Sequence, residues 1–225
     1  MAYLRVLSIQ GTDHLPDEKE WQWIRGACHH VCALLLLKLP KFDLNGCARL
    51  TILFGPPEGG RPEYSELLGT SALYLPDRDP AEVSRVSGVD RSEFALSLLQ
   101  SSIAGIASRK GRSELVERLE QACREIREDG YAGRIPVRKL RRKIPGGPEV
   151  RVFRRLSPSR GEHWEVVVSG VDERTHSIPM GEAATNDLTE VYKFSRVEEG
   201  AFLVQDRLRH ETFRLDLSPW RRSNS

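Results

Sequence analysis

The chain has 225 residues, of which 39% are hydrophobic and 29% charged, and its formal net charge is +2. This composition is typical of a folded protein and excludes an intrinsically disordered chain. The small net charge does not by itself indicate a polyanionic partner. No apolar run approaches the roughly 20 residues that a membrane-spanning helix needs.

The N-terminal part predicts strands around one long helix. A strand over residues 3–9 precedes a helix over 17–39, and a second strand over 49–54 is expected to form a long hairpin with a return strand over 66–75. The long helix is predicted to be the central core helix, because apolar residues recur on one face at three- and four-residue steps: Trp21, Ile24, Cys28, Val31 and Leu35.

Two further helices are predicted over 92–110 and 113–128. The joint between them is short, so we expect an antiparallel pair. Asp90 and Glu93 have the spacing of a capping box at the start of the first helix, and Gly130 ends the second.

Helical periodicity is absent after Gly130, and five short strands are predicted instead: 150–156, 164–168, 191–194, 202–206 and 212–217. The last two are expected to form a hairpin. The sequence therefore predicts an α+β fold: a mixed sheet with a central buried helix and a helical pair, followed by a smaller β-rich unit. The predicted parts are an N-terminal domain over 1–133, a basic linker over 134–148 and a β-rich domain or subdomain over 149–225.

The four cysteines do not form the dense framework of a small secreted domain, so we expect free thiols in a reducing compartment. Cys28 and Cys32 lie one helical turn apart, a spacing that could supply two zinc ligands. His30 points nearly opposite, so completing the site would require Cys47, Cys123 or His14. Cys28 belongs to the apolar face of the helix, which favours packing of buried thiols over a metal site or a Cys–His catalytic pair.

The loop after the second strand, GPPEGGRP over 55–62, resembles the phosphate-binding loop of AAA-type ATPases, GPPxxGK[ST]. That resemblance implies nucleotide binding through a lysine and a hydroxyl group. Arg61 and Pro62 stand at those two positions, and proline also removes a backbone donor. We therefore interpret the segment as a Gly/Pro-rich hairpin loop.

Histidines and acids of the β-rich half suggest a second possible site. Alternation along a strand places His163 and Glu165 on one face and Trp164 on the other. A metal or acid–base site would form only if His176 joined them. A solvated strand face is the favoured interpretation.

A basic segment over 134–160 carries the strongest functional signal, with Glu149 as its only acid. The candidate partner-binding residues within it are Arg138, Lys139, Arg141, Arg142, Arg154 and Arg155. Such a segment could bind an acidic protein or nucleic acid, or it could be a solvated surface paired with nearby acids. Aromatic residues for base stacking are sparse.

No motif predicts a catalytic residue, a cofactor or a metal, so we expect a non-enzymatic, cytoplasmic binding protein. The excess of arginine over lysine favours a bacterial source. This general character is similar to that of the immunity proteins that bacteria make against toxin domains, which implies a protein partner, possibly a toxin domain, whose active site the protein would occlude. Two alternatives stay open: a nucleic-acid-binding or regulatory module that uses the segment 134–160, and an enzyme whose active-site residues are dispersed along the chain.

Overall fold

The structure is a computed structural model that describes residues 3–11, 18–44, 46–57, 62–79, 81–170, 174–182 and 188–220. The chain divides into two compact units. Residues 1–133 and 156–161 form the N-terminal unit, and residues 134–155 and 162–225 form the C-terminal unit. The α+β prediction is confirmed.

The N-terminal unit contains a four-stranded sheet in the order β1-β2-β4-β3. Its strands and helices have the following bounds: β1 Val6–Gly11, α1 Glu18–Lys38, β2 Arg49–Phe54, β3 Tyr64–Leu67, β4 Thr70–Leu75, α2 Ala81–Ser84, α3 Gly88–Arg109 and α4 Glu114–Glu128. The strands β1, β2 and β4 run parallel, and β3 pairs antiparallel with β4.

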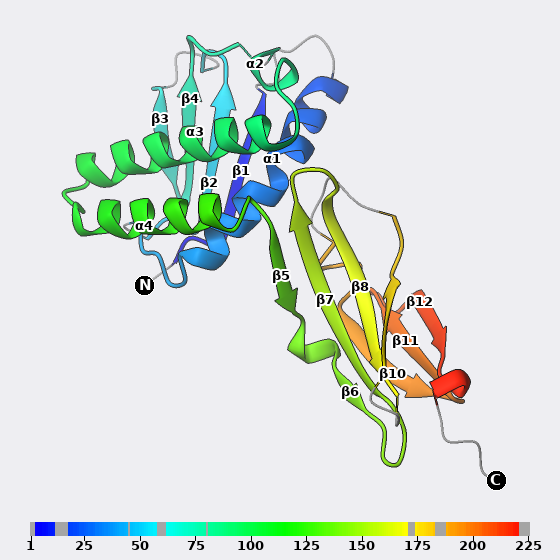
Figure 1. Cartoon of the computed structure of the whole chain (residues 1–225). Helices are drawn as coiled ribbons and strands as arrows, with labels where there is room; N and C mark the ends of the chain where they lie inside the picture. The colour runs from blue at the N-terminus through cyan, green and yellow to red at the C-terminus, as the bar shows by residue number, and fades with distance from the viewer. Residues whose placement is uncertain are drawn as a thin grey trace. The chain divides into compact units, whose positions relative to one another are not determined.

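All three long helices cover one face of this sheet. Figure 1 shows α3 and α4 side by side across the sheet, and α1 packs against β1, α3 and α4. Side chains that alternate along the strands and point toward the helices are buried, among them Ile9, Ile52 and Phe54. Cys28, Val31 and Leu35 of α1 are fully buried, which confirms the predicted core helix.

Two predictions for the N-terminal unit are wrong. The strand over 70–75 runs parallel to 49–54 and is not its hairpin partner, because the short strand β3 forms the hairpin with β4 instead. Asp90 and Glu93 do not form a capping box: both lie within α3, and the N-cap residue Ser87 makes no side-chain capping bond. The predicted helix residue Asp17 and the loop residue Arg61 lie outside the described residues.

The C-terminal unit consists of two sheets that share one core. A five-stranded sheet has the order β5-β7-β8-β9, with β6 paired to β7, and a three-stranded sheet has the order β10-β11-β12. The bounds are β5 Gly133–Pro136, η2 Arg138–Leu140, β6 Arg142–Lys143, β7 Glu149–Ser157, β8 Gly161–Ser169, β9 Thr175–Pro179, β10 Phe194–Glu198, β11 Ala201–Gln205, β12 Glu211–Asp216 and η3 Ser218–Trp220.

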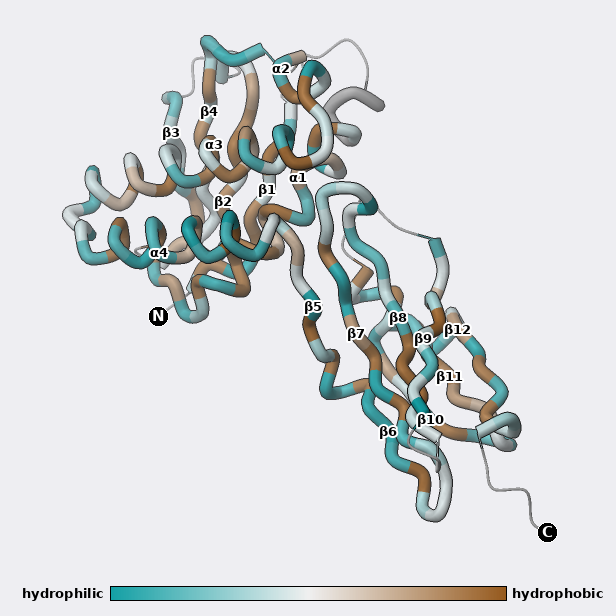
Figure 2. Tube along the Cα trace, in the orientation of Figure 1, coloured by the Kyte–Doolittle hydropathy of each residue, from teal (hydrophilic) through white to brown (hydrophobic). Residues whose placement is uncertain are grey.

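Hydrophobic and hydrophilic residues alternate along these strands (Figure 2). The inward residues form the core, which includes Val152, Trp164, Val166, Phe202 and Val204. The β11–β12 hairpin is confirmed. The segment 134–148, treated above as a linker, contains η2, β6 and most of β5, and β6 pairs with β7.

Glu93 joins α3 to α4 through a charged network. Arg127 donates two hydrogen bonds to its carboxylate, each of 2.9 Å, and Tyr131 and Ser97 donate further bonds. The Arg127 bonds lower the pKa of Glu93 to about 2, although burial opposes this shift. Because the folded-state pKa lies below the ordinary value of 4.5, the ionised carboxylate stabilises the fold above about pH 4.5, and this contribution is lost as the pH falls toward 2.

We therefore predict that Glu93→Gln lowers the free energy of unfolding at neutral pH. The difference from the parent protein should narrow below about pH 4.5 and be smallest near pH 2. Urea denaturation measured across this pH range checks the prediction. Glu128→Gln, at an exposed position of α4, is the matched control, and an equal pH dependence of the two variants would contradict the assignment.

Candidate functional site

The structure separates the six predicted partner-binding residues into different environments. Arg138 and Lys139 lie exposed in η2. Arg141 forms an ion pair of 2.5 Å with Glu149. The Arg142 guanidinium donates hydrogen bonds to three backbone carbonyls, those of Lys139, Arg141 and Ser195. These four residues thus lie in η2, in β6 or between the two.

Arg154 points into the C-terminal unit. Its Nη2 lies 2.5 Å from Oε2 of Glu162, a carboxylate that is fully buried. Trp164 Nε1 and the backbone N–H of Leu188 donate to the other oxygen of Glu162, at 2.7 and 3.1 Å. Arg154 therefore stabilises the interior of this unit.

Arg155, the next residue along β7, points to the opposite face of the five-stranded sheet. This face carries a group that we call the arginine face: Arg134, Arg151, Phe153, Arg155, Glu165 and Ser177. Successive side chains of a strand alternate between faces. Since Trp164 and Val166 belong to the core, Glu165 between them lies on the outer face.

Glu165 is the centre of the arginine face. Arg134 Nε lies 2.8 Å from one of its oxygens, and Arg155 Nη1 lies 3.1 Å from the other. The Ser177 hydroxyl also donates to it, at 3.0 Å. Burial raises the pKa of Glu165, but the bonds from Arg155, Arg134 and Ser177 outweigh burial, and the pKa is lowered. The carboxylate is therefore ionised at neutral pH.

The arginines are also positioned by contacts other than Glu165. The Arg134 guanidinium lies 3.8 Å from the ring centroid of Phe153, the distance of a close cation–π contact. Arg151 Nη2 donates to Ser169 Oγ at 3.0 Å. The face thus presents two guanidinium groups bound to one carboxylate and a third, that of Arg151, bound to Ser169.

The histidine site considered above does not assemble. Trp164 lies in the core and Glu165 on the outer face, as the alternation predicts. His176 pairs with Val168 in the β8–β9 register, so it lies on the core side of the sheet, where its ring meets Trp220. His176 therefore cannot join Glu165.

Cys28, Cys32 and His30 of α1 are buried. Cys28 and Cys32 are free thiols, and burial raises the pKa of both, that of Cys28 to about 12. His30 shares a hydrogen bond of 2.9 Å with Ser92, and burial lowers its pKa to about 4. Within the described residues, no group of His, Cys, Asp and Glu side chains could hold a metal ion.

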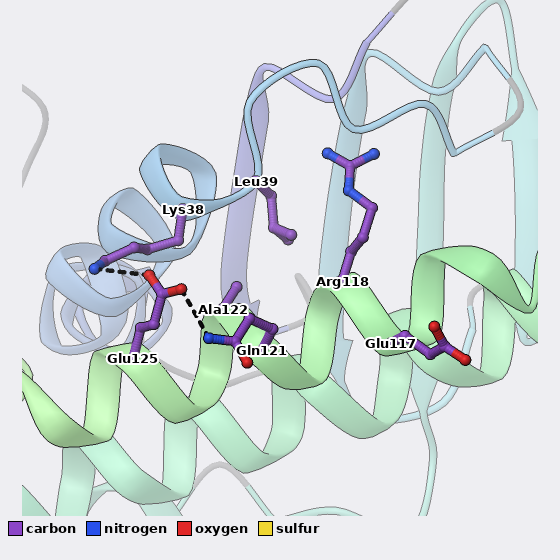
Figure 3. Close-up of a pocket in the computed structure, with 7 residues that line it drawn as sticks. All are labelled: Lys38, Leu39, Glu117, Arg118, Gln121, Ala122 and Glu125. Atoms are coloured by element: carbon purple, nitrogen blue, oxygen red, sulfur yellow. Dashed lines mark hydrogen bonds and ion pairs between the residues drawn. The ribbon is translucent and has the colours of Figure 1, made fainter.

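A shallow pocket lies between the end of α1 and α4 (Figure 3). Its polar groups bond to one another: Lys38 lies 3.0 Å from Glu125, and Gln121 donates to Glu125 at 3.0 Å. Arg118 points away from them, and its Nη2 donates to the Pro40 carbonyl. These contacts join the two helices.

Comparisons with family models, with curated proteins and with solved structures find no match to this chain. None of the helices in the described part of the chain combines the length and apolar character that crossing a membrane requires.

The ion pair inside the C-terminal unit gives a stability prediction. Glu162→Ala should lower the free energy of unfolding by about 3–5 kcal/mol, because Arg154 is left largely buried without this carboxylate. The double variant Arg154→Met with Glu162→Leu should recover the part of that loss that comes from the unpaired Arg154 charge. Trp164 Nε1–H and the Leu188 N–H still lose their acceptor, so recovery should be incomplete. Chemical denaturation of the three proteins measures both effects.

The matched control is the exposed pair of Arg196 and Glu198, whose side chains are about half exposed. Glu198→Ala should cost less than about 1 kcal/mol. Equal losses for the two alanine variants would contradict the structural role of Glu162.

Proposed function

We propose that this protein is a non-enzymatic protein-binding protein that covers an acidic surface of a protein partner with its arginine face. The observation that carries the proposal is the shared carboxylate of Glu165. Arg134 and Arg155 have side chains 47% and 45% exposed, yet both are held by this one buried acid. Cations fixed in this way lose little conformational entropy when they bind a carboxylate.

The arginine face has donors to offer a partner. The bond to Glu165 engages one nitrogen of Arg134 and one of Arg155, whereas a guanidinium group carries five N–H donors. Partner carboxylates can therefore bind without breaking the bonds that position the arginines. A guanidinium group that pairs with a carboxylate through two parallel hydrogen bonds fixes the orientation of the partner as well as adding affinity.

Nucleic acid is the second candidate partner, because three clustered arginines would also attract phosphates. The aromatic ring of the face favours the protein partner. Surfaces that bind single strands present open aromatic rings to the bases, whereas Arg134 lies over the ring of Phe153.

The finer proposal is that the partner is a toxin domain, that the protein neutralises it in the bacterial cytoplasm, and that binding occludes the toxin's active site. The buried thiols of Cys28 and Cys32 and the buried His30 favour a binding role over cysteine-based catalysis, which needs an accessible thiolate. The exposed Arg138 and Lys139 are proposed as further contacts.

The test begins with affinity purification of the tagged protein from a nuclease-treated lysate of its host. The captured protein is identified, purified and titrated against the parent chain and its variants. Replacing Arg134, Arg151 and Arg155 together by Gln should weaken its affinity at least about tenfold and flatten the dependence of affinity on salt. Arg138→Gln with Lys139→Gln tests the contribution of η2 separately.

The control replaces Arg196 and Arg214, exposed arginines of the three-stranded sheet, by Gln. This variant has nearly the same net charge as the first but an intact arginine face, so it should bind with almost the parent affinity. Equal weakening by both variants would contradict a specific site. Capture that disappears with nuclease treatment would favour nucleic acid instead.

A further inference from the structure

The turn between β3 and β4 exposes two leucines at its tip. Leu67, the last residue of β3, is 73% exposed, and Leu68 is 96% exposed. These are the two most exposed large hydrophobic residues among those described. Single exposed apolar residues are common on protein surfaces, but adjacent ones form a contiguous apolar patch, and such patches mark interaction sites when they are large enough.

The backbone of this turn does not favour leucine. Leu68 and Gly69 both have positive φ, 48° and 75°, a combination that favours asparagine or aspartate followed by glycine. The β10–β11 hairpin has the same pair of conformations at Glu199 and Gly200, with φ of 49° and 83°. In that hairpin a charged residue, Glu199, occupies the position that Leu68 has in the β3–β4 turn. Leu68 therefore adopts an unfavourable conformation without gaining any burial within the chain.

Hydrogen bonds and an ion pair join the β3–β4 hairpin to α3 and to β2. Lys110, at the end of α3, forms an ion pair of 2.7 Å with Glu66 of β3. The Tyr64 hydroxyl bonds to Glu66 and to the buried Ser71. The Gly69 carbonyl accepts hydrogen bonds from the start of β2, at 2.7 and 3.1 Å. The strands on both sides of the tip are therefore fixed by these bonds, which limits the backbone entropy that binding would cost.

An exposed cation lies in the same row of the sheet as the tip. The register pairs Val6 with Arg49, Arg49 with Thr70, and Thr70 with Leu67. Paired residues point to the same side, and this side is the sheet face that the three long helices leave uncovered. Among the described residues, no ion pair to Arg49 occurs, and its side chain is exposed. Leu67 and Arg49 thus lie on one face of the sheet, and Leu68 follows Leu67 in the turn at its edge. We call these three residues the leucine tip.

We propose that the leucine tip is a second docking surface, which binds a protein segment that combines an apolar side chain with a carboxylate. Leu67 and Leu68 would enter an apolar contact, and Arg49 would pair with the acid. This proposal goes beyond the arginine face and does not depend on it. A membrane fits less well, because stable membrane association needs a larger apolar face and several cations. Among the described residues, this surface offers two strongly exposed leucines, the partly exposed Val6 and the cation of Arg49.

The experiment selects a random peptide display library on the full-length protein and titrates synthetic copies of the enriched peptides. Enriched peptides should combine an acidic residue with a neighbouring aliphatic or aromatic one. Leu68→Asn should weaken their binding at least about tenfold, the loss expected at a hot-spot residue. The same variant should shift the urea midpoint upward, because asparagine accepts the left-handed conformation more readily than leucine does.

Glu199→Asn is the matched control, since it relieves the same backbone conformation in the other hairpin and should leave peptide affinity unchanged. Arg214→Gln, at an exposed arginine that belongs to neither proposed surface, should also leave it unchanged, which excludes a general effect of charge. The proposal is overturned if no peptide is enriched, or if enriched peptides bind Leu68→Asn as tightly as the parent. Two other results would also overturn it. One is self-association in sedimentation experiments that Leu68→Asn abolishes, and the other is flotation with anionic vesicles that the same variant abolishes.

Discussion

A carboxylate removed from water must be matched by cations or by N–H donors, and strand β8 imposes this constraint on both of its faces. Glu162 is buried on the core side and binds Arg154, while Glu165 is nearly buried on the outer side and binds Arg134 and Arg155. Glu162 therefore binds an arginine of the basic segment in the interior, and Glu165 binds two at the surface. The arginine face exists because Glu165 holds two cations in fixed positions.

Both proposed surfaces belong to strands and tight turns, which position side chains more accurately than long loops do. The arginine face combines β5, β7, β8 and β9 of one sheet, and the leucine tip closes a two-residue hairpin. One surface offers charge and the other offers apolar contact. A binding protein needs both kinds of contact, because charge gives orientation and rate while apolar anchors give most of the affinity.

Elements with strong periodicity could be predicted from the sequence, and features that depend on distant residues could not. The helices α1, α3 and α4 and the strand β2 follow from their hydrophobic repeats. The parallel pairing of β4 with β2 does not, because an alternating pattern is the same for either strand direction. The basic segment can be recognised in the sequence. The different roles of Arg154 and Arg155 cannot, because they depend on Glu162 and Glu165, which β8 places on opposite faces of the sheet. Arg134 reaches Glu165 from another strand, so spacing along the chain could not identify this pair.

The most direct test of the arginine face follows the arginine side chains themselves. The ¹⁵N-labelled protein is titrated with the partner captured from its host, and the Nε–H resonances of its arginines are recorded by NMR. Our account predicts that the largest changes occur at Arg134, Arg151 and Arg155, while those of the buried Arg154 and of Arg214 on the other sheet stay small. Changes confined to other arginines, with these three unaffected, would contradict the proposed binding face.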